Sequence, residues 1–301
     1  MKAGVVGLGD MGSGLALNLI RTGFQTTAFD LNQERLDAFA AMGGQPAAGV
    51  AGVGENAAAV FVMVMTGAQA RAVILGDDGL AAAMAPGSVI LLTATISPAD
   101  VVAIAAELEP TGIDFIDTPV SGGFPGAQAG TLTMMAAAPA PLLAAHREVM
   151  EAVSADIHHV GDEAGMGQTV KACLQTIIGS VFAATSEAAG LAARAGISGQ
   201  ILYDVVSTSG AGSGVANTAL ENIIDRQFVG TGSHISTMYK DLTISLDMAR
   251  DLGVPLHTAA TAMQLFQAAK TRHPEGDNWI IIRLVEAITG VQLHRNGPVE
   301  A

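Results

Sequence analysis

Short apolar runs recur through the first half of the chain, and stretches in which apolar residues have helical spacing separate them. Several runs are apolar throughout, which is typical of parallel strands whose two faces are both covered. These patterns predict strands at residues 2–6, 25–29, 59–65, 88–92 and 114–116, and helices at 12–21, 32–42 and 98–108. Strands that alternate with helices predict a doubly wound α/β domain with a parallel sheet.

The pattern changes after about Gly161, because no further strand-like run follows. Helical periodicity predicts helices at residues 165–195, 199–206, 216–224, 237–252, 256–270 and 279–289. We therefore predict two domains, an α/β domain at 1–162 and an all-helical domain at 163–301. The tail from His294 onward is expected to be loose.

Composition and charge narrow the classes of partner. Half of the residues are hydrophobic and only 14% are charged, whereas average soluble domains have roughly 25% charged residues. Such a surface is either covered by a second subunit or simply rich in alanine, and we favour a homo-oligomer. The net charge of −14, without a run of Lys or Arg, repels polyanions and argues against nucleic acid as a partner.

Other features bear on the compartment. Cys173 is the single cysteine, so no internal disulfide can form, as is typical of a reducing compartment. The apolar start of the chain is broken by Asp10 and is too short for a signal peptide. The apolar segment 172–186 is shorter than the roughly 20 residues that cross a bilayer. We expect a soluble, cytoplasmic protein that does not bind membranes. No metal site is expected either, because His234, His257 and His273 lack metal-ligand spacing.

Gly7, Gly9 and Gly12 form a G-x-G-x-x-G pattern. In dinucleotide-binding turns these glycines allow a tight bend and close approach of the backbone to a pyrophosphate, while N–H groups at the helix start bind phosphate oxygens. The pattern alone is weak in a chain with 36 glycines, but here it follows a strand, opens a helix and precedes an acid after the second strand. It predicts a Rossmann domain whose dinucleotide lies on Gly7, Leu8, Gly9, Asp10, Met11 and Gly12.

Asp30, at the end of the second predicted strand, indicates which dinucleotide is bound. A carboxylate at this position accepts hydrogen bonds from the ribose hydroxyls and repels a 2′-phosphate. Leu31, Asn32 and Gln33 follow, so no arginine stands directly after the acid. NAD is therefore favoured over NADP; the alternative is that Asp30 only caps the next helix.

Lys171 lies in a helical segment that is apolar on nearly every side, as in helices buried in a core or an interface. Burial of an amine disfavours its charged form, and this suits a general acid/base. Gln175 lies one turn later on the same face and can hold a substrate oxygen or the lysine itself. Gly167, one turn earlier, is expected to leave space for a ligand. The alternative is a lysine that extends its amine into water.

A second candidate loop, residues 117–123 (Asp-Thr-Pro-Val-Ser-Gly-Gly), follows the last predicted strand. It ends in small residues that offer a hydroxyl and N–H groups, a combination that suits a carboxylate. An ordinary Gly/Ser turn has the same composition, so the loop alone does not decide between a binding site and a turn.

Together, four blocks in order resemble the β-hydroxyacid dehydrogenase family, which includes 3-hydroxyisobutyrate dehydrogenase. Residues 7–12 resemble its opening G-L-G-x-M-G, and residues 117–132 resemble its substrate-binding D-x-P-V-S-G-G-x-x-G-A-x-x-G-T-L. Residues 167–175 resemble its catalytic G-x-x-x-K-x-x-x-N/Q, and residues 240–242 resemble its late K-D-L block. The resemblance spans about residues 3–290. It implies a Rossmann domain, a long interdomain helix and a helical domain with oligomer contacts.

The resemblance also implies roles for these residues. Lys171 would be the catalytic acid/base, and Ser121, Gly122 and Gly123 would bind the substrate carboxylate, while Gln175 would orient the substrate. The implied enzyme is an NAD-dependent oxidoreductase that acts on the hydroxyl of a small hydroxy acid such as 3-hydroxyisobutyrate, as a homodimer or homotetramer.

On the cofactor side, the resemblance implies that Val64 and Met65 run along the dinucleotide and that Thr95 lies beside the nicotinamide. Lys240 would orient both substrate and cofactor. Leu174 departs from the family pattern, because many members have Asn there, and one side-chain contact is expected to be missing. Other members have proline at the position of Met65.

Several alternatives to this function stay open on the sequence alone. Segments 202–208 and 261–266 look most like the L-threonate dehydrogenase branch, and reduction of tartronate semialdehyde or succinic semialdehyde is another alternative. Relatives that reduce imines replace the lysine that this chain keeps. A decarboxylating 6-phosphogluconate dehydrogenase would need a basic phosphate pocket, which the scarcity of Lys and Arg opposes. A non-catalytic NAD-binding protein would not need Lys171, Gln175 and the Ser121 loop together.

Overall fold

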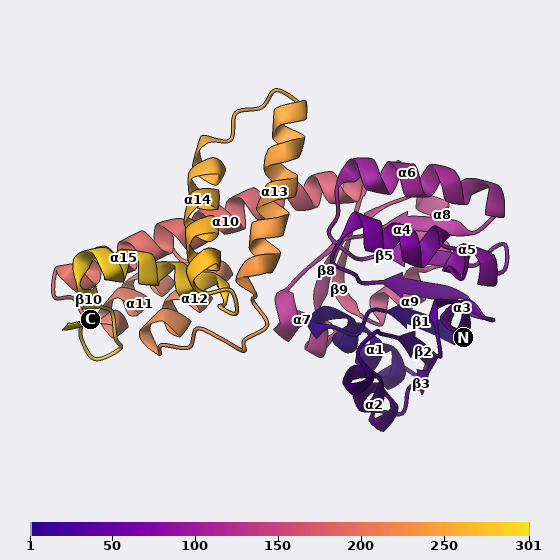
Figure 1. Cartoon of the computed structure of the whole chain (residues 1–301), viewed down its shortest axis with the longest axis horizontal. Coiled ribbons are helices and arrows are strands. Elements are labelled where there is room, and N and C mark those ends of the chain that lie inside the picture. The colour runs from indigo at the N-terminus through magenta and orange to yellow at the C-terminus, as the bar shows by residue number, and fades with distance from the viewer. Residues whose placement is uncertain (1, 301) are drawn as a thin grey trace. The chain divides into compact units, whose positions relative to one another are not determined.

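The structure is a computed structural model that describes residues 2–300. The chain forms two compact units, Met1–Lys171 and Ala172–Ala301 (Figure 1). The division lies inside one long helix, α10 (Met166–Arg194), whose first residues belong to the first unit.

A parallel sheet forms the centre of the first unit. Its strands are β1 (Lys2–Val6), β2 (Gln25–Phe29), β3 (Gln45–Pro46), β4 (Ala59–Val62), β5 (Val89–Leu92) and β6 (Asp114–Asp117). They pair in the order β3-β2-β1-β4-β5-β6, every pair parallel. This confirms the predicted Rossmann-type sheet, and β1 and β2 have the predicted bounds.

Three further strands extend the sheet beyond β6 and were missed by the sequence pattern. They are β7 (Val120–Ser121), β8 (Leu132–Ala137) and β9 (Ser154–Gly161). β8 runs antiparallel to β6 and β7 and parallel to β9. β9 is largely exposed and polar, so it lacks the apolar run expected for a strand covered on both faces.

Helices cover both faces of the sheet (Figure 1). One core lies between the sheet and α1 (Asp10–Arg21), α2 (Gln33–Ala41) and α9 (Arg147–Glu151). The other lies under α3 (Val50–Gly54), α4 (Gly67–Leu75), α5 (Leu80–Ala83) and α6 (Pro98–Leu108). Alternate residues of one strand enter opposite cores, as Val5 and Val6 do. The unit also contains η1 (Glu109–Thr111), α7 (Gly123–Ala129) and α8 (Ala140–Ala145).

The second unit is helical. After α10 come α11 (Gly199–Thr208), α12 (Gly214–Ile224), α13 (Ile235–Asp251), α14 (His257–Arg272), η2 (Asn278–Ile281) and α15 (Ile282–Thr289). Its core centres on aromatic rings, with the Phe182 ring 6.4 Å from those of Phe266 and Trp279. The predicted fold class, an α/β domain followed by a helical domain, is confirmed.

The end of the chain corrects two expectations. Strands do occur after Gly161, because β10 (Val291–Gln292) and β11 (Val299–Glu300) form a small antiparallel hairpin. The tail is also not loose. The N–H groups of Gly199 and Gln200 donate to the carbonyls of His294 and Arg295, at 2.9 and 3.0 Å. The tail therefore completes the N-terminal turn of α11.

Helix α10 is long and apolar enough, by length and composition alone, to cross a membrane, with a mean hydropathy of 1.3 over its most apolar stretch. Half of that stretch is buried inside the structure. Core helices of soluble proteins have the same length and hydropathy. Packing against the rest of the chain explains the apolar residues on the buried side of α10.

Candidate active site

The glycine loop between β1 and α1 has no room for side chains on its inner side. A Cβ on Gly7, whose φ is +94°, would lie 2.1 Å from the Met63 carbonyl oxygen, and a Cβ on Gly12 would lie 1.8 Å from the Gly7 carbonyl oxygen. At Gly9 the nearest atom to such a Cβ is Arg35 Nη1, at 4.0 Å. The loop is therefore tight against the protein and open at Gly9, as a pyrophosphate requires.

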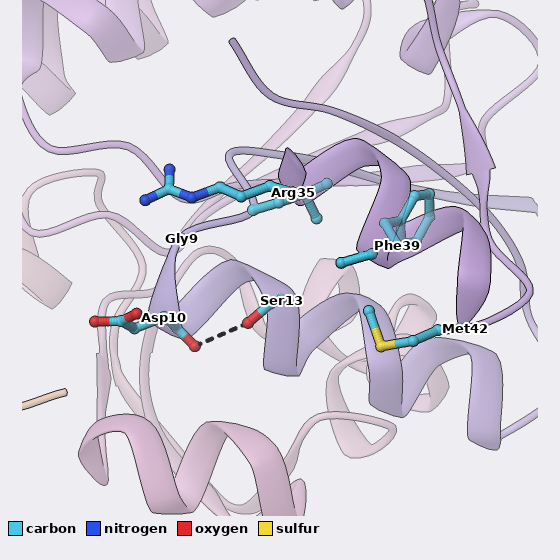
Figure 2. A pocket seen from close by; sticks show the side chains of 8 residues that line it. Gly9, Asp10, Ser13, Arg35, Phe39 and Met42 are labelled. Carbon is cyan, nitrogen blue, oxygen red and sulfur yellow. Dashed lines mark hydrogen bonds between the residues drawn. The ribbon is translucent and has the colours of Figure 1, made fainter. Parts of the chain in front are cut away.

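A hollow adjoins this loop, between α1 and α2 (Figure 2). Its lining consists of Leu8, Gly9, Asp10, Ser13, Arg35, Ala38, Phe39 and Met42. Gly9 caps α1 without a side-chain hydrogen bond, so the N–H groups of the first turn are suited to phosphate oxygens. These features fit the dinucleotide predicted from the glycine spacing.

The Asp30 carboxylate lies against the glycine loop. Its Oδ2 accepts the Leu8 N–H at 2.7 Å, and its Oδ1 accepts the Asn32 N–H at 2.8 Å. Arg35 Nη1 lies 3.4 Å from Asp30 Oδ2. Asp30 thus links the loop to the start of α2, whereas Asn32 supplies the N-cap of that helix. Arg35 was not recognised from the sequence, because it does not follow Asp30 directly but lies in the first turn of α2.

Val64 and Met65 follow β4 beside the loop. Val64 Cγ1 would lie 3.7 Å from a Cβ on Gly7, and the Met65 side chain is half exposed. The Met65 N–H donates to Gln69 Oε1 at 2.9 Å, within the capping box of Thr66 and Gln69 at the start of α4. The structure therefore places Val64 against Gly7 of the glycine loop and ties the Met65 backbone to the start of α4.

Helix α1 is joined to α7, the helix that follows the Ser121 loop. A Cβ on Gly14 would lie 2.5 Å from the Ala127 backbone, so the two helices are in backbone contact there. The buried Asn18 donates through Nδ2 to the carbonyls of Ala127 and Gly14, both at 2.8 Å. Gly14 and Asn18 were not recognised from the sequence, although an amide within the otherwise apolar buried face of α1 was an available signal.

The Ser121 loop begins at β7, where Ser121 pairs with Thr133 of β8. Gly122 and Gly123 follow with φ values of +127° and +59°, conformations that favour glycine. Both glycines are exposed, while Ser121 is partly buried. The loop therefore presents the backbone of Gly122 and Gly123 to solvent directly after the paired strand β7.

Asp117 is fully buried at the end of β6. Its Oδ2 accepts the N–H groups of Gly165 at 2.9 Å and Gln168 at 3.3 Å, and its Oδ1 accepts Gln168 Nε2 at 2.9 Å. Burial raises the pKa of this carboxyl to about 6, although the hydrogen bonds from Gln168 and Gly165 oppose the shift. Asp117 thus binds the start of α10 to the sheet.

The sequence led us to expect that Gly167 leaves space for a ligand, but the structure shows no such space at this glycine. A Cβ there would lie 2.6 Å from the Met135 carbonyl oxygen and 2.8 Å from that of Asp117. The absent side chain instead lets the first turn of α10 pack directly against the end of β6 and the middle of β8. Lys171 follows one turn later and is buried, with 6% of its surface exposed.

In the second unit, Asp241 of α13 brings two predicted site residues together. Gln175 Nε2 donates to Asp241 Oδ2 at 2.5 Å, and Lys240 Nζ lies 2.8 Å from Asp241 Oδ1. Ser245 Oγ donates to the Ala172 carbonyl at 3.0 Å, which holds α10 and α13 together near this point. Among the residues that the structure describes, none donates a hydrogen bond to the buried Gln175 Oε1.

Two family profiles match the chain. Residues 2–161 match the NAD binding domain of 6-phosphogluconate dehydrogenase, and residues 165–285 match the NAD-binding domain of NADP-dependent 3-hydroxyisobutyrate dehydrogenase. They meet between residues 161 and 165, next to the division predicted at 162.

Whole-length relatives agree with these matches. L-threonate dehydrogenase from Cupriavidus necator is 35% identical over 286 residues, which cover 95% of this chain and 96% of the relative. 2-(Hydroxymethyl)glutarate dehydrogenase from Eubacterium barkeri is 30% identical over 294 residues and covers 97% of each chain. The crystal structure of 3-hydroxyisobutyrate dehydrogenase from Salmonella typhimurium has a TM-score of 0.87 and 34% identity, covering 94% of this chain and 99% of that one. The chain belongs to the β-hydroxyacid dehydrogenase family and is an NAD(P)-binding oxidoreductase of hydroxy acids.

Proposed function

We propose that the chain oxidises one hydroxyl of a small hydroxy acid, with Lys171 as the general base and NAD as the hydride acceptor. The observation that carries this assignment is a lysine buried on α10 at the position of the family's catalytic lysine. As the C–H bond breaks, its electron pair leaves as hydride; Lys171 takes the hydroxyl proton and a C=O bond forms. The bound cofactor supplies the hydride acceptor at C4 of its nicotinamide.

The substrate carboxylate is assigned to Ser121, Gly122 and Gly123. This assignment is supported by the positive φ angles of the two glycines, which expose the backbone of the loop, and by the pairing of Ser121 with β8, which holds the loop on the sheet. Gln175 Oε1 supplies a buried acceptor for a substrate hydroxyl, because Asp241 already engages the other end of the amide. Lys240 and Thr95 are assigned to positioning of the substrate and the nicotinamide.

NAD rather than NADP is favoured by the Asp30 carboxylate beside Leu8 of the glycine loop. A ribose that carries a 2′-phosphate would meet that negative charge, whereas free ribose hydroxyls can donate to its remaining lone pairs. Arg35 offsets part of this repulsion, since it lies 3.4 Å from the same carboxylate. The preference for NAD is therefore expected to be strong but not absolute.

Among hydroxy acids, L-threonate and 3-hydroxyisobutyrate are the two candidates. L-threonate is favoured by the relative from Cupriavidus necator, which covers nearly the whole chain, and by the acceptor on Gln175, which a polyhydroxylated acid can use. A screen of NAD reduction with L-threonate, 3-hydroxyisobutyrate, serine, glycerate and 4-hydroxybutyrate tests both. L-threonate is expected to have the highest kcat/KM; turnover of none of them, despite tight binding of NAD, would favour a non-catalytic protein.

We also propose a homo-oligomer in the cytoplasm, with functional domains at 1–162 and 163–301. Support for the oligomer comes from large apolar side chains exposed on α10 and α11 of the second unit, Ile177, Leu191, Ile201 and Val205, each 57% to 73% exposed. Sedimentation equilibrium distinguishes a monomer from a dimer or tetramer.

A further inference from the structure

The buried amide of Gln168, in the first turn of α10, makes an unusual pair of contacts with the loop that carries Thr95. Gln168 Oε1 accepts the Ile96 N–H at 3.1 Å, and Gln168 Nε2 donates to the Ala94 carbonyl at 3.0 Å. In a parallel sheet, one residue of a strand bonds the carbonyl and the N–H that flank a residue of the next strand, as Gln168 does with Ala94 and Ile96. The side chain therefore takes the place of a strand and fixes the backbone on both sides of Thr95.

The same amide is held from a third direction. Its Nε2 also donates to Asp117 Oδ1 at 2.9 Å, and Asp117 Oδ2 accepts the backbone N–H of Gln168 itself at 3.3 Å. Gln168 and Asp117 have only 1% and 0% of their surface exposed. With two donor contacts on the nitrogen and one acceptor contact on the oxygen, the amide cannot flip without losing all three.

These contacts join three segments to which separate roles are assigned. The loop after β5 carries Thr95, the end of β6 leads through Asp117 to Ser121, and the first turn of α10 leads to Lys171, three residues after Gln168. All three belong to the first unit. Gly165 and Gly167 complete the junction, because the first donates to Asp117 and the second packs against its backbone.

We propose that Gln168 is a positioning residue for the reaction, which fixes Lys171 relative to Thr95 and the Ser121 loop. The proposal rests on the proposed role of Lys171 as the acid/base. Gln168 would act through geometry. Loss of its side-chain hydrogen bonds frees the first turn of α10 to rotate or to shift along its axis. A displacement of about 1 Å at a reacting group can lower the rate about 100-fold.

The test compares Gln168→Met, which keeps the length and apolar stem of the side chain but none of its hydrogen bonds, with the parent. kcat is expected to fall about 10- to 100-fold. KM for the hydroxy acid and Kd for NADH are expected to stay within about threefold, because the Gln168 side chain bonds Ala94, Ile96 and Asp117 and not the glycine loop or residues 121–123. Thr169→Val is the matched control, since it removes one hydrogen bond of the same turn, from Thr169 Oγ1 to the Gly165 carbonyl at 2.8 Å. It is expected to retain the parent kcat.

A second readout does not depend on turnover. Reductive methylation followed by peptide mass spectrometry gives the labelling rate of Lys171, with Lys2 and Lys270 as internal references. Lys171, buried in the parent, is expected to react at least severalfold faster in Gln168→Met and at the parent rate in Thr169→Val. An inactive parent would refute the proposed function, while a changed labelling rate would still support the junction. Unchanged kcat and labelling in a folded Gln168→Met, or an equal loss of kcat in Thr169→Val, would overturn the positioning role.

Discussion

Asp117 makes the stability of the first unit depend on pH in an unusual direction. Most buried carboxyls that pair with cations have a lowered pKa, but burial raises the pKa of Asp117 from 3.8 to about 6. The folded state therefore holds this proton at pH values where the unfolded state has released it. As pH rises through this window, the unfolded state gains relative to the folded state, and the free energy of unfolding falls.

The size of the effect follows from the shift. The difference between 3.8 and about 6 corresponds to about 3 kcal/mol at 1.36 kcal/mol per pKa unit. About 2 kcal/mol of this is lost between about pH 4.5 and pH 7.5, and the contribution is constant above about pH 7.5. Asp117→Asn removes the titration, although its amide meets donors at Gly165 and Gln168 and so costs a fixed amount of stability at every pH.

Urea unfolding of the parent and of Asp117→Asn, followed by far-UV circular dichroism at intervals between about pH 4.5 and pH 7.5, isolates the contribution of Asp117 to the free energy of unfolding. The stability of the parent relative to the Asn variant should fall by about 2 kcal/mol as pH rises. Other groups titrate in both proteins and cancel in the difference. A difference that is flat, or that grows with pH, would show that the three N–H donors outweigh burial and that the carboxyl stays ionised throughout.

Two further predictions concern the cofactor half. Asp30→Ser should weaken binding of 5′-AMP and strengthen binding of 2′,5′-ADP, because Arg35 then faces the 2′-phosphate without a competing carboxylate. Isothermal titration calorimetry should show that the gain in affinity for 2′,5′-ADP disappears in Asp30→Ser/Arg35→Ser. A gain that persists in the double variant would exclude Arg35 as its source. Gly14→Ala should destabilise the protein by about 1–3 kcal/mol, because the new Cβ overlaps the Ala127 backbone. Gly49→Ala, with no atom within 4 Å of the new Cβ, is the matched control in thermal unfolding. Equal melting temperatures of the two variants would refute the contact between Gly14 and Ala127.

Local patterns were sufficient for part of the fold. β1, β2 and α6 have the bounds expected from the sequence, and α6 illustrates why, since Ser97 caps it and Pro98 stands in its first turn. β8 and β9 were not predicted. β8 is apolar and buried, but its run of Met and Ala also suits a helix, and its extended form depends on pairing with β6, β7 and β9. β9 is largely exposed and polar, so it has no apolar run. The small hairpin at the end of the chain likewise depends on residues that contact it from α11 and α12.

The candidate site divides in the same way. The glycine loop and Asp30 follow from short spacings, and Lys171 follows from the apolar segment around it. The contacts that hold these residues join partners far apart in sequence: Asn18 and Ala127 are separated by 109 positions, Asp117 and Gln168 by 51, and Gln175 and Asp241 by 66. No local pattern encodes such pairs, so Asn18 and Gln168 were recognised only in the structure.

The most direct test of the proposed function is the rate of hydride transfer by Lys171→Ala. A single-turnover measurement with NAD and L-threonate, or with whichever hydroxy acid the screen identifies, records NADH formation at 340 nm without the later product-release steps. Loss of the general base should slow this step about 10²- to 10⁴-fold, while Kd for NAD stays close to that of the parent because the glycine loop and Asp30 are intact. A variant that forms NADH at the parent rate would contradict the assignment of Lys171 as the acid/base.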